Sequence, residues 1–309
     1  MTMSKALLFP GQGSQTVGML ADVAEHTSLI KDTFAQASDA LGFDLWALVQ
    51  DGPDSRLNQT ENTQPALLTA SVALYKAAVA EGLADVTVMA GHSLGEYSAL
   101  VCAGALGFED AVKLVRDRGQ FMQQAVAEGE GAMAAVIGVD DDVIRQCCAE
   151  AQQGQVVAPV NYNSPGQVVI AGHKAAVARA GEALKEKGAK RVLPLPVSVP
   201  SHCELMKPAA EQLKQRLAEI SIAQPKIAVI NNVDVESAMA EDAIRDALVR
   251  QLYSPVRWTE SVQKIAAMAV TESYEVGPGK VLSGLVKRID KQLTCTPLNT
   301  VDALQALKG

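Results

Sequence analysis

The sequence predicts an α/β protein with a large domain, built on a mostly parallel sheet, and a small α+β domain inserted into it. Short, continuously apolar segments alternate with amphipathic helical segments early in the chain, which is typical of a parallel sheet covered on both faces. A β-α-β-β-α-β order then follows over about 70 residues, and glycine and proline clusters mark both of its borders. We therefore expect a large domain of residues 1–128 and 199–309 and a small domain of residues 129–198.

The elements of the large domain follow from its apolar runs. Ala6–Phe9 and Val86–Ala90 are predicted strands, because short continuous apolar runs are typical of strands buried on both faces. A helix is predicted to begin at Gln64, with Pro65 in its first turn, and to end at Gly82.

The small domain has the element order of a split βαβ, or ferredoxin-like, unit. Its predicted strands and helices are, in chain order, Ala132–Val139, Asp140–Ala151, Val156–Tyr162, Gln167–Ala171, Lys174–Lys187 and Arg191–Val197. A cleft between this domain and the large one is a natural place for a substrate.

The bulk composition excludes several classes of protein. The 309 residues are 48% hydrophobic and 20% charged, which suits a globular chain with a large core. The net charge of −8 argues against nucleic acid as a general partner. No signal peptide and no run of about 18 apolar residues is evident, so we expect no membrane span. Five cysteines without a Cys-x-x-Cys spacing favour neither disulfides nor a metal site, and we expect a cytoplasmic protein.

The segment Gly91-His-Ser-Leu-Gly95 carries the sharpest chemical signal. A G-x-S-x-G pattern between a strand and a helix, here from about Glu96, is the nucleophile elbow of serine acyl-transfer enzymes. Its glycines permit a tight turn that exposes the serine hydroxyl, and the following helix directs its N–H groups at developing negative charge. The context makes a chance turn the weaker interpretation, and Ser93 is the predicted nucleophile.

A serine needs a base, and four histidines are available. His26 lies in a polar helical stretch, His92 should point away from Ser93, and His173 begins a predicted helix, where a structural or capping role suits it. Elimination leaves His202, just after the predicted return to the large domain, although a loop histidine is more often structural.

No motif in the sequence identifies an acidic residue as the partner of His202. The helix predicted at Glu241–Tyr253 offers a substitute, because its last carbonyls lack intrahelical partners and its dipole favours a cation. A carbonyl near Gln251 is therefore a candidate to orient the imidazole. Cys203, beside the histidine, is interpreted as an inert thiol rather than a second nucleophile.

A glycine-rich loop, Phe9-Pro-Gly-Gln-Gly-Ser-Gln15, follows the first predicted strand. It lacks the third glycine of a dinucleotide fingerprint and the Gly-Lys-Ser/Thr of a P-loop. The N–H groups of Gln12 and Leu94 are candidates for an oxyanion hole, whereas the bland alternative is a simple tight turn.

One arginine falls on an apolar helix face. In the helix predicted at Glu109–Ala125, Arg118 shares a face with Ala111, Val115 and Met122, so its side chain should point inward. A buried guanidinium needs a partner, which is either an internal Asp or Glu or the carboxylate of a substrate. The pattern leaves both possibilities open.

Together these motifs resemble the bacterial malonyl-CoA:acyl carrier protein transacylases over nearly the whole chain. The matching segments are Gly11–Gln15, Gly91–Glu96, Arg118-Gly119 with Met122, Asn161-x-Asn163-Ser-Pro-Gly166, Val199–His202 and Glu275–Gly279. The resemblance implies an α/β-hydrolase-like domain with a ferredoxin-like insert, no cofactor and no metal, and a chain that acts as a monomer on malonyl-CoA and acyl carrier protein.

The resemblance also implies roles for particular residues. Ser93 and His202 would form the catalytic pair with the Gln251 carbonyl as orienter, and the Gln12 and Leu94 N–H groups would form the oxyanion hole. The substrate-binding residues would be Arg118, Met122 and Asn163.

The acyl carrier protein is acidic in this family, so a chain of net charge −8 needs a local basic patch to receive it. Two basic clusters, one expected on each side of the cleft, are candidates for this docking patch. The alternative is that both are ordinary solvent-exposed faces without a partner. The first consists of Lys187, Lys190 and Arg191, and the second of Lys280, Lys287 and Arg288.

Other functions remain open at this point. A serine hydrolase or thioesterase would use the same nucleophile, with water in place of the carrier thiol. An acyltransferase for another acyl-CoA, such as methylmalonyl-CoA, is also possible, because Val199-Pro-Ser201 matches neither usual pattern of the related polyketide acyltransferases. A non-catalytic carrier-binding module would not need the elbow.

Overall fold

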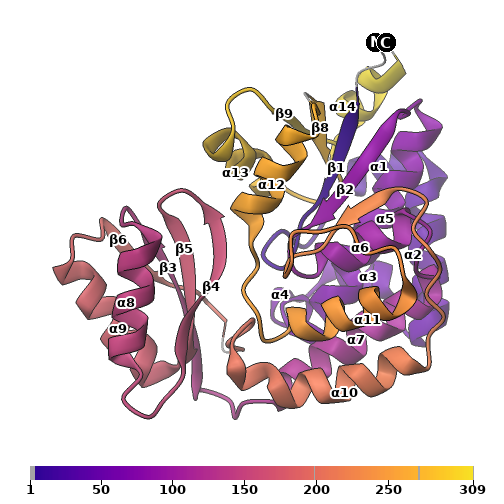
Figure 1. Ribbon diagram of the computed structural model, residues 1–309. Helices are drawn as coiled ribbons and strands as arrows, with labels where there is room; N and C mark the ends of the chain where they lie inside the picture. Colours follow the sequence, from indigo (N-terminus) through magenta and orange to yellow (C-terminus); the bar gives the residue numbers. More distant parts are fainter. Residues whose placement is uncertain (1–3, 198, 271, 309) are drawn as a thin grey trace.

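The structure, a computed structural model, describes residues 4–197, 199–270 and 272–308 (Figure 1). Its strands form two sheets, one of five strands and one of four. The outer limits of the predicted domains, at residues 1, 198 and 309, lie outside the described residues. The four-stranded sheet lies within the range predicted for the small domain, and the five-stranded sheet takes strands from both sides of it in the sequence.

The five-stranded sheet has the order β7-β2-β1-β8-β9, and each pair of neighbouring strands is parallel. Its strands are β1 (Lys5–Phe9), β2 (Val86–Gly91), β7 (Ala228–Ile230), β8 (Glu272–Glu275) and β9 (Thr294–Pro297). Because the strands are parallel, their carboxyl ends meet at one edge, and the loops that follow β1, β2 and β7 lie there together. The predicted parallel sheet is confirmed.

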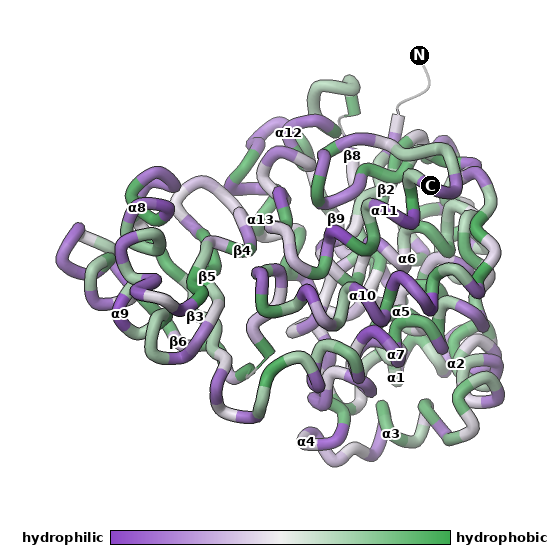
Figure 2. Tube along the Cα trace, turned by 60° about the horizontal axis from the view of Figure 1, so that its bottom comes forward, coloured by the Kyte–Doolittle hydropathy of each residue, from purple (hydrophilic) through white to green (hydrophobic). Residues whose placement is uncertain are grey.

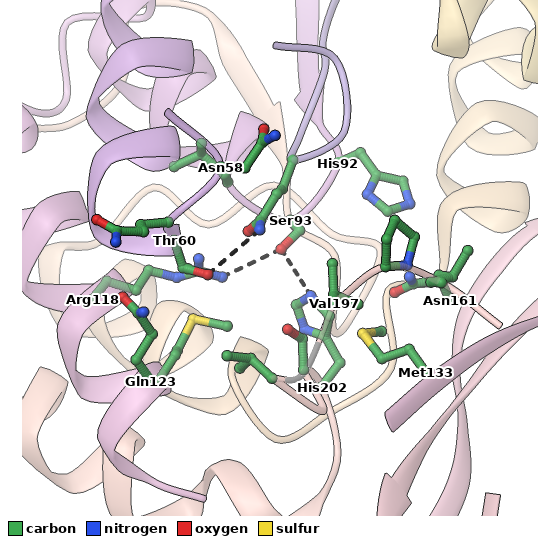
Figure 3. A pocket seen from close by; sticks show the side chains of 18 of the residues that line it. Asn58, Thr60, His92, Ser93, Arg118, Gln123, Met133, Asn161, Val197 and His202 are labelled. Carbon is green, nitrogen blue, oxygen red and sulfur yellow. Dashed lines mark hydrogen bonds between the residues drawn. The ribbon is translucent and has the colours of Figure 1, made fainter. Parts of the chain in front are cut away.

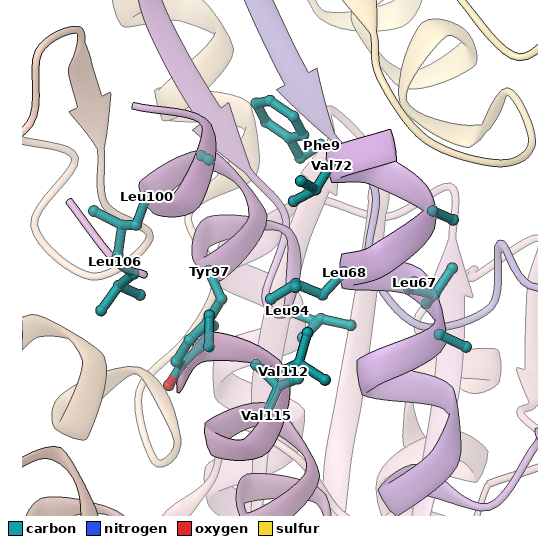
Figure 4. Packing of buried hydrophobic residues seen from close by; sticks show 14 of the residues in the cluster. Phe9, Leu67, Leu68, Val72, Leu94, Tyr97, Leu100, Leu106, Val112 and Val115 are labelled. Atoms are coloured by element: carbon teal, nitrogen blue, oxygen red, sulfur yellow. The ribbon is translucent and has the colours of Figure 1, made fainter. Parts of the chain in front are cut away.

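Both faces of this sheet are buried, as the continuous apolar runs predicted. Leu7 and Phe9 of β1 pack into the larger hydrophobic cluster, and Ala6 and Leu8 pack into a second cluster on the opposite face. Figure 4 shows part of the larger cluster, in which Val72 lies beside Phe9. The helices that contribute side chains to this larger cluster are α1 (Ala21–His26), α2 (Ser28–Leu41), α3 (Leu45–Asp51), α4 (Asp54–Leu57), α5 (Thr60–Ala80), α6 (Gly95–Cys102), α7 (Phe108–Gln124), α10 (Lys207–Ala218), α11 (Glu241–Gln251) and α14 (Val301–Gln305). The opposite face is covered by α12 (Trp258–Ala267) and α13 (Val281–Ile289).

The prediction that α5 begins at Gln64 is wrong, because the helix starts at Thr60 and contains Pro65 in its interior. Side chains hold the extra turn to the preceding segment. The Thr63 hydroxyl donates to the Leu57 carbonyl over 2.6 Å, and the Asn62 amide donates to the Arg56 carbonyl over 3.0 Å. These side-chain bonds add a turn before Pro65 and do not involve the backbone N–H group that proline lacks. Pro65 therefore lies inside the helix here and not in its first turn.

The four-stranded sheet is antiparallel and has the order β4-β5-β3-β6. Its elements are β3 (Gly131–Ile137), α8 (Asp141–Ala151), β4 (Val157–Ser164), β5 (Gln167–His173), α9 (Lys174–Glu186) and β6 (Arg191–Pro194), so the predicted β-α-β-β-α-β order is confirmed. Hydrophobic and hydrophilic residues alternate along α8 and α9 (Figure 2), as expected of helices with one buried face. Their buried residues pack on one face of the sheet.

The other face of this sheet turns toward the loop that leads back to the five-stranded sheet. Met133, Val169 and Ala171 of this face form a small cluster with Cys203. That loop continues through a short 3₁₀ turn (η1, Glu204–Met206) into α10, and a second such turn (η2, Ala306–Lys308) ends the described chain.

Helices α5 and α7 approach each other closely at Gly119, and this contact generates a prediction. A Cβ atom at Gly119 would lie 2.7 Å from both the Glu61 Cα and the Thr60 carbonyl oxygen, which are backbone atoms of α5. Gly119→Ala should therefore lower the free energy of unfolding by about 1–3 kcal/mol, despite the better helix propensity of alanine. Chemical denaturation measures the effect.

Gly284→Ala in α13 is the matched control, because nothing lies within 4 Å of its Cβ position. This variant should raise the free energy of unfolding by about 0.5–1 kcal/mol. If Gly119→Ala also raised it, the close approach of α5 and α7 would not be a constraint.

Candidate active site

The nucleophile elbow is a turn that only glycine permits on either side of Ser93. A Cβ atom at Gly91 would lie 1.8 Å from the Gly95 carbonyl carbon, and one at Gly95 would lie 2.0 Å from the Phe9 carbonyl oxygen. Between them Ser93 adopts a φ of 51°, in the left-handed region that is strained for a serine. The strained turn joins β2 directly to α6 and presents the Ser93 hydroxyl to the cavity.

His202 meets this hydroxyl from a loop that lies more than 100 residues later in the chain. Its Nε2 atom is 2.8 Å from Ser93 Oγ (Figure 3). Its Nδ1 atom is 2.7 Å from the Gln251 carbonyl oxygen. Because a carbonyl only accepts hydrogen bonds, Nδ1 carries the proton and Nε2 is left to accept the proton of Ser93. Gln251 is the last residue of α11, so its carbonyl has no intrahelical partner, as the argument from the helix end anticipated.

The electrostatics of the site keep His202 neutral. Burial, followed by the positive charge of Arg118, lowers the pKa of His202 to about 3. The imidazole is therefore an unprotonated base across the physiological pH range. Nearby Cys203 is no rival as nucleophile, because burial raises the pKa of its thiol to about 11 and its Sγ atom contacts the Pro200 carbonyl.

Arg118 is buried, as the helix pattern predicted, and its exposed fraction is only 1%. Nη1 donates to Gln64 Oε1 over 2.8 Å, and Nη2 donates to Gln251 Oε1 over 3.0 Å and to Ser93 Oγ over 3.3 Å. Nε has no hydrogen-bond partner, and no Asp or Glu of the described chain forms an ion pair with the guanidinium. Of the two partners that the sequence left open, the internal carboxylate is absent from the described residues. The guanidinium remains as a buried positive charge at the nucleophile.

Gln12 and Leu94 come together because the glycine-rich loop packs on the elbow. A Cβ atom at Gly11 would lie 2.5 Å from the His92 carbonyl oxygen, so only glycine allows this approach. Both residues line the same cavity as Ser93. Within the described residues, neither backbone N–H group has a hydrogen-bond acceptor, so both remain available to a ligand.

The cavity has a volume of 310 Å³ and lies between the two sheets. The large sheet and its helices contribute Gln12, Ser93, Leu94, Arg118, Met122 and His202, and the small sheet with the segment after it contributes Met133, Asn161, Leu195, Pro196 and Val197. The carboxyl edge of the parallel sheet therefore provides the reactive groups. The small sheet and the segment after it provide the opposite wall, which is apolar except for Asn161.

Asn163 is not among the residues that line the cavity, so a direct role in substrate binding is not supported. Its Oδ1 atom instead lies 2.8 Å from His92 Nε2, and Asn161 lines the cavity in its place. The pairing of β4 with β5 is irregular on both sides of Tyr162, which alters the simple alternation of side chains expected along a strand.

Neither basic cluster lines the cavity. Arg191 pairs with Ile137 at the end of the small sheet away from Met133, which lines the cavity, so the first cluster lies at that far end. The second cluster lies on α13, where Arg288 donates to Gln167 at the start of β5 over 2.8 Å. The expectation of one cluster on each side of the cavity is therefore wrong for the first cluster.

A buried polar network beneath Ser93 was not identified from the sequence. The Glu96 carboxylate accepts from the Asn232 N–H group and from Gln251 Nε2, both over 2.9 Å. Asn232 Oδ1 in turn accepts from the Ser93 N–H group over 2.8 Å. The available signal was a glutamate directly after the elbow, at the start of an otherwise apolar helix.

Two further searches cover the described part of the chain. It contains no group of three His, Cys, Asp or Glu side chains that could hold a metal ion. None of its helices is long and apolar enough to cross a membrane.

Comparison with known proteins gives concordant matches. Residues 6–300 match the family model described as the acyl transferase domain. The chain is 64% identical over 301 residues to the malonyl CoA-acyl carrier protein transacylase of Escherichia coli strain K12, covering 97% of each chain. It matches the crystal structure of an acyl carrier protein S-malonyltransferase from Vibrio cholerae with a TM-score of 0.97 and 61% identity, covering 99% of this chain and 100% of that one. A malonyl-transacylase solved in complex with a type II PKS acyl-carrier protein also matches, with a TM-score of 0.97, 56% identity and 98% coverage of each chain.

Proposed function

Because this chain belongs to the acyl transferase domain family, we propose that it transfers the malonyl group from malonyl-CoA to the phosphopantetheine thiol of acyl carrier protein. The observation that carries the proposal is the buried Arg118 guanidinium, which reaches Ser93 Oγ and lacks an ionic partner among the described residues. An acyl group attached to Ser93 that ends in a carboxylate supplies that partner.

The first half-reaction acylates Ser93. His202 Nε2 takes the hydroxyl proton as Oγ attacks the thioester carbonyl, and the Gln12 and Leu94 N–H groups stabilise the oxyanion of the tetrahedral intermediate. The C–S bond then breaks, and the protonated His202 gives its proton to the coenzyme A sulfur. The Gln251 carbonyl holds the imidazole in place and stabilises its transient positive charge.

The second half-reaction reverses these steps with the carrier thiol. His202 removes the thiol proton as the sulfur attacks the malonyl-serine ester. The bond from the acyl carbon to Ser93 Oγ then breaks, and His202 gives that proton to the leaving Oγ. All of these groups come from one chain and none is a cofactor, so the proposed reaction needs neither a cofactor nor a second subunit. All five cysteines are free, which supports the proposed cytoplasmic location.

Alternative acyl groups and acceptors are weaker proposals. A hydrolase would resolve the same ester with water, and transfer to the carrier is preferred because the matched relatives are named as transacylases or S-malonyltransferases. Methylmalonyl-CoA carries the same carboxylate, so Arg118 does not discriminate against it, and malonyl is preferred because the matched relatives are named for malonyl.

We place carrier docking on the α13 cluster of Lys280, Lys287 and Arg288. Lys280 follows Gly279, whose Cβ position lies 3.7 Å from Ser14 in the glycine-rich loop that lines the cavity. All three side chains are exposed. The helix thus extends a basic surface from the cavity loop to the edge of the small sheet, where an acidic partner can be attracted.

The central prediction concerns a covalent intermediate. Incubation with malonyl-CoA should add one malonyl group to the chain, as seen by intact mass, and Ser93→Ala should abolish the adduct because no other nucleophile is paired with His202. Ser201→Ala removes another hydroxyl that lines the cavity and should still form the adduct. An adduct of normal yield on Ser93→Ala would disprove the assignment.

A second prediction separates the acyl groups. Arg118→Ala should slow malonyl transfer by two to three orders of magnitude, equivalent to about 3–4 kcal/mol, and acetyl transfer much less, because only malonyl carries the partner carboxylate. Single-turnover acylation with both thioesters measures the ratio. Arg116→Ala is the matched control on the same helix. In the described chain the Arg116 guanidinium donates to the Leu41 carbonyl, lies over the Phe43 ring and does not line the cavity. Equal losses for both acyl groups would make Arg118 purely structural.

A third prediction tests the docking surface. Lys280→Glu with Lys287→Glu should raise the KM for carrier protein, most strongly at low salt, and should leave acylation by malonyl-CoA almost unchanged. Lys187→Glu with Lys190→Glu, at the far end of the small sheet, is the control and should affect neither half-reaction. Equal effects of the α13 variant on both half-reactions would point to coenzyme A phosphates or to stability.

A further inference from the structure

We propose that Glu96 is a positioning residue for the transfer reaction, holding Gln251 so that its side-chain oxygen faces Arg118 and its main-chain carbonyl faces His202. This inference rests on the proposed function. Glu96 touches neither Ser93 Oγ nor the imidazole in the structure, so it acts through Gln251 and Asn232.

The contacts of Gln251 place it between two buried opposite charges. Its Oε1 atom accepts from Arg118 Nη2 over 3.0 Å, and its Nε2 atom donates to Glu96 Oε2 over 2.9 Å. Nε2 also donates to the Ser93 carbonyl over 3.0 Å. The side chain is completely buried, so no water competes for these bonds.

The two charges fix which way the amide points. A guanidinium only donates hydrogen bonds and a carboxylate only accepts them. A flipped Gln251 amide would turn its NH₂ group toward Arg118 and its oxygen toward Glu96, and both contacts would be repulsive. Removing the charge of Glu96 removes one of these two restraints on the residue that also orients His202.

Packing alone does not account for a carboxylate at this position. Glu96 is 2% exposed and forms no ion pair with any described residue, so it carries the desolvation cost of a buried charge. Its charge and that of Arg118 attract each other across the Gln251 amide. This arrangement offsets only part of the positive charge of the guanidinium and leaves free the face that it turns to Ser93.

Glu96 is the group in this network that is expected to change charge near pH 7. Burial raises the pKa of Glu96 to about 7; bonds from Asn232 and Gln251 and the charge of Arg118 oppose the rise, and the charge of Asp234 adds to it. The pKa of Tyr97 is raised to about 12 and that of His202 is lowered to about 3, so neither group changes charge near pH 7. Burial also lowers the pKa of His92.

The acylation rate of the wild-type protein should therefore fall as the pH falls through about 7, because protonated Glu96 no longer holds the Gln251 amide by charge. The histidine base is not the source of that loss, since it stays neutral in this range. In Glu96→Gln the rate should be about 10–100-fold lower at pH 8, and the loss near pH 7 should be absent. The preference for malonyl over acetyl should also fall. Single-turnover acylation between pH 5.5 and 9, followed by intact mass, measures all three effects.

Stability distinguishes positioning from a structural role. A carboxylate with a raised pKa in the folded state contributes most to stability below its unfolded pKa, and that contribution is lost as the pH rises to about 7. The free energy of unfolding of Glu96→Gln should therefore increase, relative to that of the wild type at the same pH, as the pH rises from 4.5 to 7. A variant that is slower yet no less stable at pH 8 fits a positioning residue.

Glu275→Gln is the matched control, because Glu275 is also a buried carboxylate that accepts backbone N–H groups, in its case Leu282 and Ser283 at the start of α13. It should lower stability and keep the wild-type pH dependence of the rate. If Glu96→Gln retained the wild-type rate and its fall near pH 7, or lost stability with that fall intact, the inference would be wrong. A wild-type chain that formed no malonyl adduct would instead overturn the proposed function.

Discussion

The position of Gln251 is the constraint on which the rest of the site depends. Its carbonyl, freed by the end of α11, accepts from His202 over 2.7 Å and so selects the tautomer that can deprotonate Ser93. Its side chain accepts from Arg118 and also donates to the Ser93 carbonyl. A shift of this one residue would therefore misplace the base and the arginine and loosen the nucleophile turn together.

The fold brings the groups of the site together at one edge of the sheet. Parallel strands deliver the loops after β1, β2 and β7 to one edge, which brings Gln12, Ser93 and Asn232 together from distant parts of the sequence. The glycines allow backbones to touch there, since a Cβ atom at Gly95 would lie 2.0 Å from the Phe9 carbonyl oxygen. The small sheet and the segment after it line the cavity with apolar side chains and with Asn161.

The sequence predicted those features that have a local physical cause. The elbow, the inward face of Arg118 and the free carbonyl at the end of α11 each follow from a short segment and its periodicity. The start of α5 was missed because it depends on side-chain bonds to the preceding segment. The location of Asn163 was missed because an irregularity in β4 depends on its partner strand. The role of Glu96 depends on partners at positions 232 and 251, and such long-range pairing leaves no mark in a single sequence.

The unpaired charge of Arg118 links recognition of the acyl group to the strength of the base. Burial and, after it, that charge hold the pKa of His202 down to about 3, which makes the imidazole a weak acceptor for the serine proton. A carboxylate bound to the guanidinium would offset this charge and let the pKa of His202 rise, so that the imidazolium formed during attack is less costly. An acyl group without a carboxylate gives no such compensation. In the proposed reaction the arginine would therefore do more than hold the malonyl group, because it would also keep the base weak until an acyl group of the right charge is bound.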